Sequence, residues 1–250
     1  MVILFAFLWG YGMYSRIQNT SQNNSINISS HMNTLTAEKI SRLHSTINDP
    51  NGDYFTGTVD EQKAIVREFV VDNSNSDSAY LYIAANTAFK IGDLKDAAFL
   101  FYAAQLRKHF DYRRFNLGVA NGNNIQTYLG FLNETTGASI NPAIMRSPTD
   151  FSGAIDMIEK WQVIPSDTAL YPKEEYYTAN PVSKDQYQII ADETKKDFME
   201  GFGNKYKNIL NDPKKFEAII FMQDYNFGKI PQNPENDARY QEYTILINQV

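Results

Sequence analysis

The sequence predicts an all-α fold, and three observations lead to that prediction. Amphipathic helix patterns and helix-capping signals recur along the body of the chain. Alternating strand patterns are scarce, and the best of them is Tyr243 to Ile247. The 250 residues are 43% apolar and 14% aromatic, which is enough to build a packed core. We therefore expect an irregular array of packed helices.

The chain begins with an uncharged apolar segment, Val2 to Tyr14, which has the length of a signal-peptide core and is too short for a full membrane span. We interpret residues 1–15 as a signal or anchor segment, and an apolar helix docked on the core is the alternative. Residues 16–35 are rich in Asn and Ser, which predicts a disordered linker. This layout indicates a protein of the periplasm or cell envelope that meets the membrane only through residues 2–14.

Residues 36–250 are expected to form a helical domain. A long segment between Ile164 and Pro181 holds three prolines and three tyrosines, which is unusual for a simple helix connection. We expect this segment to cover a surface, and a subdivision of the helical domain would fall near residues 164–182.

Capping signals predict where the helices begin and end. Thr58 to Glu61 and Ser183 to Gln186 both have the pattern of a capping box, in which two side chains satisfy free amides of the first turn. Pro148 and Pro213 suit the first helical position, where a missing amide costs nothing. Helix ends are expected at the glycines Gly92, Gly122, Gly137 and Gly228. Besides the hairpin described next, the expected helices are Arg113–Ala120, Asn124–Thr136, Pro148–Val163, Ser183–Glu200 and Pro213–Asn226.

Residues 78–110 predict two antiparallel helices of similar length. They are joined by a tight turn at Gly92 and Asp93, with Asp93 as the second N-cap. Small side chains on both helices allow their axes to approach closely, and we expect Ala85 and Ala97 to face each other.

The spacing of this hairpin resembles a tetratricopeptide-type helix pair. The residues that carry the resemblance are Leu81, Ala85, Gly92, Asp93, Ala97, Phe101 and Ala104. The resemblance implies that the first helix lines a concave groove with Tyr82, Asn86, Phe89 and Lys90. The alternative is that these four side chains pack against an adjacent helix. Tyr82 stands where members that grip a peptide carboxylate have lysine, so that specialised activity is not expected.

Composition argues against several classes of function. The net charge of −6 makes nucleic acid an improbable partner. The absence of cysteine excludes disulfides and thiolate metal sites. The three histidines, His31, His44 and His109, do not have helical metal-ligand spacing, so we expect no metal and no cofactor.

Three further patterns each have a structural and a functional interpretation. The basic run from Arg107 to Arg114 either offsets the carbonyls at a helix end or binds an acidic partner. Glu174 and Glu175 are either solvated loop residues or an acid–base pair. Gly201-Phe202-Gly203 begins a phosphate-loop pattern, but Tyr206 stands where the third glycine belongs and no strand precedes it. For all three we favour the structural interpretation.

These observations predict a non-catalytic protein–protein interaction module of the bacterial envelope rather than an enzyme. Its layout resembles that of exported immunity proteins, which implies a secreted antibacterial toxin as the partner protein. The expected partner-binding residues are Tyr82, Asn86, Phe89, Lys90, Tyr176 and Tyr177, because aromatic anchors carry much of the energy of interfaces. The alternatives are a carboxylate-based envelope hydrolase and a structural helper of an envelope assembly.

Overall fold

The protein is all-α in the part that its computed structural model describes, which comprises residues 57–71, 76, 78–115, 124–164 and 182–249. The signal or anchor segment, the linker, Gly122, Glu174 and Glu175 lie outside these residues. None of the helices within these ranges is both long and apolar enough to cross a membrane.

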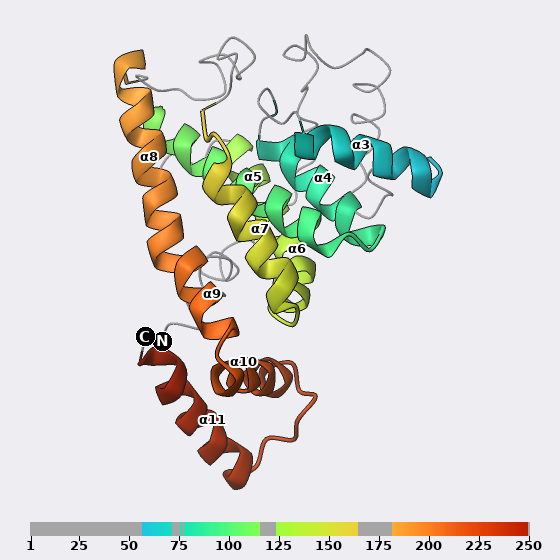
Figure 1. Ribbon diagram of the computed structural model, residues 1–250, viewed down its shortest axis with the longest axis vertical. Helices are drawn as coiled ribbons and strands as arrows, with labels where there is room; N and C mark the ends of the chain where they lie inside the picture. Colours follow the sequence, from blue (N-terminus) through green and yellow to red (C-terminus); the bar gives the residue numbers. More distant parts are fainter. Residues whose placement is uncertain (1–56, 72–75, 77, 116–123, 165–181, 250) are drawn as a thin grey trace.

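Nine segments of α-helix follow one another along the described chain (Figure 1). They are α3 (Val59–Val71), α4 (Ser78–Lys90), α5 (Leu94–Arg114), α6 (Asn124–Ile144), α7 (Pro148–Lys160), α8 (Tyr187–Phe198), α9 (Asn204–Leu210), α10 (Pro213–Asn226) and α11 (Pro234–Asn248). A 3-10 turn, Lys184–Gln186, precedes α8, and a π-helical turn, Met199–Gly203, joins α8 to α9.

Helix α5 is the centre of the array. It packs against α3, α4, α6, α7 and α8, so helices from both sides of residues 165–181 share its core. The apolar side chains that α5 buries completely include Ala97, Leu100 and Ala104. Since α5 is covered on several sides, it also buries polar side chains, namely those of Arg107, Lys108, Asp111 and Arg114.

The turn between α4 and α5 forms as the sequence predicts. Gly92 has a positive φ of 85°, its amide donates to the carbonyl of Phe89, and the amide of Asp93 donates to that of Ala88. This Schellman arrangement ends α4, and the Asp93 carboxylate then caps α5 by accepting from the amide of Asp96. The expectation that the two helices have similar lengths is wrong. Because α5 stays covered by neighbouring helices, it has 21 residues against 13 in α4 and runs through to Arg114.

Other predicted helix starts are confirmed. The amide of Thr58 donates to Oε2 of Glu61 at 2.7 Å, and the amide of Glu61 donates to Oγ1 of Thr58 at 3.3 Å, which closes the capping box. Pro148 and Pro213 are at the starts of α7 and α10. The second predicted box does not close, because Ser183 makes no capping bond and the chain first forms the 3-10 turn.

One expected helix end is wrong. Gly137 lies inside α6 rather than at a helix end. Its missing side chain allows α6 to approach α5 closely. A Cβ atom on Gly137 would lie 2.8 Å from the Phe101 ring. The strand pattern of Tyr243 to Ile247 lies in α11, where Ile247 is buried and Ile245 is exposed.

The C-terminal helices extend the array. Helix α8, the π turn and α9 form one long rod, beyond which α10 and α11 form a hairpin set apart from α3–α7 (Figure 1). Gly228 ends α10 in a Schellman arrangement like that of Gly92, as predicted. Gly201-Phe202-Gly203, which was not expected to bind phosphate, lies in the π turn. Its Phe202 lies 5.2 Å, between ring centroids, from Tyr102 of α5.

Candidate functional site

Tyr82 is completely buried between helices. Its hydroxyl donates to Oδ1 of Asn133 on α6 at 3.0 Å, and its ring centroid is 5.8 Å from that of Phe101 on α5. Tyr82 therefore packs against an adjacent helix, which is the alternative interpretation of the sequence, and it does not line an open groove. The groove that the tetratricopeptide resemblance implies at this position is filled by α6.

The other predicted binding residues differ in exposure. Asn86 and Phe89 are half-buried, and Lys90 is exposed at the C-terminal end of α4. Their spacing from Tyr82, at four, seven and eight residues, places them on the same side of the helix. Tyr176 and Tyr177 lie outside the described residues.

The first arginine of the basic run is internal. Arg107 has no exposed surface, and its guanidinium donates to the carbonyls of Ser76 at 2.9 Å and Gln162 at 3.4 Å. The guanidinium carbon also lies 4.9 Å from the ring centroid of Trp161, which is cation–π geometry. Arg107 thus fastens two connecting segments to α5, and the carbonyls that it satisfies belong to these segments rather than to its own helix end.

The last two arginines of the run have opposite exposure. Arg114 pairs with Asp111 inside the protein, and its guanidinium carbon lies 4.3 Å from the ring centroid of Phe115. Arg113 is 41% exposed and pairs with Asp197 of α8 at 2.5 Å. The three arginines of the run therefore have partners within the protein. This supports a structural role for the run, although the partners are not the carbonyls at the helix end that were expected.

A polar stripe crosses the interface between α5 and α6. On α5 it consists of residues spaced by three or four, Gln105, Lys108, His109 and Tyr112. From α6, Asn133 accepts a hydrogen bond from Nε2 of Gln105 at 2.9 Å, and Glu134 is electrostatically coupled to Lys108. We call these six residues the α5–α6 polar cluster.

Burial changes the protonation of this cluster. Loss of solvent lowers the pKa of Lys108 from 10.5 to about 8, although the nearby Glu134 carboxylate acts in the opposite direction. Burial also raises the pKa of Glu134. The pKa of His109 falls from 6.5 to about 3, first through burial and then through Lys108 and Arg113. Burial, assisted by Asp111, raises the pKa of Tyr112 to about 12. Titratable groups with perturbed pKa values gathered in one place mark a candidate site.

The chemistry available in this cluster is that of an amine beside a carboxyl group. Lys108 offers a nitrogen nucleophile when it is unprotonated, and Glu134 offers a proton when it is protonated. No group of three or more histidine, aspartate or glutamate side chains suited to a metal ion occurs among the residues with described side chains.

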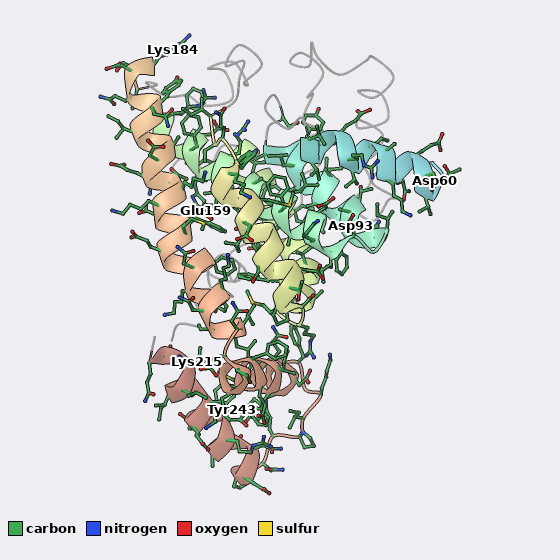
Figure 2. All side chains as sticks on the ribbon, viewed as in Figure 1. Asp60, Asp93, Glu159, Lys184, Lys215 and Tyr243 are labelled. Carbon is green, nitrogen blue, oxygen red and sulfur yellow. The ribbon has the colours of Figure 1, made fainter. Side chains whose placement is uncertain are left out.

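A second candidate surface lies on the α10–α11 hairpin. Tyr225 and Tyr240 have ring centroids 4.9 Å apart, and the Arg239 guanidinium carbon lies 4.5 Å from the ring centroid of Phe221. Tyr243 is 5.2 Å from Phe221 between ring centroids and contributes the third tyrosine (Figure 2). We call Tyr225, Arg239, Tyr240 and Tyr243 the hairpin face.

Carboxylates hold the tyrosines of the hairpin face. The Tyr243 hydroxyl donates to Oε1 of Glu217 at 3.1 Å, and the Tyr225 hydroxyl donates to Asp237. The three rings are nevertheless only half-buried. This surface was not predicted, because the pattern noted around Tyr243 was an alternation typical of strands and no helix was expected there. The signal that would have found it is the spacing of Arg239, Tyr240 and Tyr243 within one helical turn of each other.

Comparison of the chain with protein-family models, with curated proteins and with solved structures gave no match in any of the three.

Proposed function

We propose that the protein is a non-catalytic protein–protein interaction module and that its hairpin face binds the partner protein. The observation that carries this proposal is the set of half-buried tyrosines around a partly exposed arginine on one helical hairpin. Arg239 keeps 46% of its side-chain surface exposed while its guanidinium stacks on Phe221. Tyrosine and arginine are among the residue types that dominate binding energy at protein interfaces.

The hydrogen bonds of the hairpin face favour tight binding. Because the hydroxyls of Tyr225 and Tyr243 are bonded to Asp237 and Glu217, these rings are ordered before a partner arrives. Ordering side chains on binding costs about 0.5–1.5 kcal/mol for each flexible side chain, so a pre-ordered surface avoids part of that cost. Phe227 and Ile245 on the same hairpin are also exposed and add apolar area.

The apolar segment from Val2 to Tyr14 and the Asn- and Ser-rich linker support a location in the periplasm or cell envelope. In that compartment the proposed role is that of an immunity protein, which would occlude a secreted antibacterial toxin by binding it. A structural helper of an envelope assembly would bind a different partner protein through the same kind of aromatic surface. The identity of the protein bound distinguishes the two.

Alanine variants of the hairpin face test the binding proposal. The protein encoded beside this gene is the first partner to purify, and its affinity is measured by calorimetry. Tyr240→Ala and Arg239→Ala should each weaken binding by about 2 kcal/mol or more, roughly thirtyfold. Gln241→Ala is the matched control, because Gln241 is exposed on the same helix.

The results separate binding from catalysis. Affinities within twofold of wild type for both hairpin variants would contradict the proposed surface. If one Asp or Glu substitution abolished protection of the host while leaving partner affinity and melting temperature intact, the hydrolase alternative would replace binding.

The location has its own test. A fusion of alkaline phosphatase after Asn33 should be enzymatically active in a bacterial host, because that enzyme requires an oxidising compartment. An inactive phosphatase together with a fluorescent cytoplasmic reporter at the same junction would contradict export.

A further inference from the structure

Tyr225 of α10 and Tyr240 of α11 form a pair of adjoining tyrosine rings. Their centroids lie 4.9 Å apart, and their planes are inclined by 38°. Two phenol rings that are joined by a carbon–carbon bond have their centroids slightly closer than this and are twisted by a similar angle. The fold therefore holds these two rings close to the arrangement in which such a bond forms.

Solvent reaches both rings of this pair. Tyr225 and Tyr240 are half-buried, whereas Tyr82, Tyr102 and Tyr206 are buried and contact phenylalanine rings. A small one-electron oxidant in solution therefore has access to Tyr225 and Tyr240. Because each of the two rings has a second phenol beside it, a radical on one ring has a partner with which to combine.

The hydroxyl of Tyr225 already has an acceptor for its proton. It donates a hydrogen bond to Oδ1 of Asp237, which belongs to the same helix as Tyr240. A phenol that loses an electron becomes strongly acidic, so its proton leaves with the electron when an acceptor is in place. Asp237 therefore assists the removal of an electron from Tyr225.

We propose that Tyr225 and Tyr240 are a modification site, at which a one-electron oxidant derived from a peroxide joins the two rings as dityrosine. The oxidant removes one electron from each phenol, and both hydroxyl protons leave, that of Tyr225 to Asp237. The two phenoxyl radicals form a bond between ring carbons next to their oxygens, and the hydrogen atom on each of these carbons moves to the oxygen of its own ring. The pair loses two electrons and two protons in all. The electrons reduce the O–O bond of the peroxide, and the protons pass to its products or to water.

The cross-link would attach α11 covalently to α10. Helix α11 packs mainly on α10, and within α11, whose residues are all described, only Ile247 is buried. The chain has no cysteine, so a disulfide cannot hold this helix in place. A bond between rings on the two sides of the turn restricts the unfolded hairpin in the way that a disulfide does. The modification needs no partner protein, so it is independent of the binding proposal.

Oxidation of the dilute full-length protein with a photoactivated ruthenium complex and persulfate tests this proposal. Trypsin then releases Tyr225 in the peptide that ends at Lys229, and Tyr240 in the peptide that follows Arg239. Mass spectrometry of the monomer should detect these two peptides joined, with the loss of two hydrogen atoms. The yield should exceed that from protein unfolded in urea by about tenfold or more, because the fold holds the reacting rings together.

Two tyrosine variants test the choice of rings. Tyr240→Phe should remove the joined peptides, and Tyr243→Phe, the matched control, should leave their yield unchanged. Tyr243 is in the same tryptic peptide as Tyr240, and its hydroxyl also has a carboxylate partner, Glu217. The ring beside Tyr243, however, is that of Phe221, which has no hydroxyl and forms no phenoxyl radical.

Asp237→Asn tests the proton acceptor. An amide does not take up the proton of Tyr225, so the cross-link should form more slowly by about tenfold or more, with the same two peptides joined. An unchanged rate would contradict the role of Asp237.

Two results would overturn the modification site itself. One is a yield of joined peptides in the folded protein no higher than that in urea. The other is a link that fragment ions assign to Tyr243, or one that persists in the Tyr240→Phe variant. Either result would make Tyr225 and Tyr240 an ordinary packing contact. The comparison with urea uses the wild-type protein, so it does not depend on whether a variant folds.

Discussion

Nε of Arg114 donates a hydrogen bond to Oδ1 of Asp111 at 2.8 Å, and each side chain is only 2% exposed. The two residues are three positions apart on α5, so one helix supplies both charges of a buried pair. The aromatic rings of Phe110, Phe115 and Tyr187 lie around the guanidinium. Asp111 is therefore an ionic partner of this cation inside an aromatic environment.

The first prediction concerns this pair. Asp111→Ala should lower the free energy of unfolding by about 3–5 kcal/mol, because it removes one partner of an ion pair buried in the interior. Asp197→Ala, which breaks the exposed pair with Arg113, should cost no more than about 1 kcal/mol. Urea denaturation followed by circular dichroism measures both, and equal costs would contradict the distinction drawn from burial.

The second prediction compares two glycines of α6. Gly137→Ala should destabilise the protein, because the new Cβ would meet the Phe101 ring at 2.8 Å. Gly130→Ala, with nothing within 4 Å of the added atom, should stabilise it by up to about 1 kcal/mol through helix propensity. The midpoints of urea denaturation should therefore move in opposite directions, and a stabilising Gly137→Ala would refute the close approach of α5 and α6.

The third prediction concerns acid sensitivity. His109 has a folded-state pKa of about 3, below its ordinary value of 6.5, so between these pH values the unfolded chain binds a proton that the folded protein does not. Its contribution to stability is present above pH 6.5 and is lost as the pH falls toward 3, by at most about 1.4 kcal/mol per pH unit. His109→Gln should flatten this part of the stability curve. Parallel curves for wild type and variant between pH 6.5 and 4 would contradict the burial of a neutral histidine.

The fourth prediction tests the packing of the α4–α5 hairpin. Ala85 and Ala97 have no exposed surface, so replacing either with leucine should overpack the interface and cost about 1–3 kcal/mol. Ala138→Leu, at an exposed position of α6, is the control for the substitution itself. Thermal denaturation of the three variants measures the difference. Unchanged melting temperatures for both hairpin variants would show that the two alanines do not limit the approach of the helices.

Local signals predicted much of the helix framework. The Thr58–Glu61 capping box, the turn at Gly92 and the Asp93 cap depend on residues within a few positions of each other, so the sequence contains all the partners. Gly137 failed as a predicted helix end because its role depends on Phe101, which is distant in the chain. The strand-like alternation around Tyr243 forms part of a helix, which Asn233 caps at its start.

The candidate sites were harder to predict for the same reason. Tyr82 was expected in a groove, but its partner Asn133 belongs to a helix 51 residues away. The basic run appears in the sequence as a surface feature, whereas Arg107 is satisfied by the carbonyls of Ser76 and Gln162. Periodicity shows which residues share a helix face, but it does not show which neighbouring helix will cover that face.

Two arginines of α5 also hold the residues that follow α7 and those that precede α8. Arg107 binds the carbonyl of Gln162, and the carbonyl of Arg114 accepts a hydrogen bond from the amide of Val182 at 2.7 Å. Seven residues of helix separate these two arginines, about 10 Å along the axis, which roughly four extended residues can span. Both attachment points belong to one helix, so α5 sets the distance between the end of α7 and the turn that precedes α8.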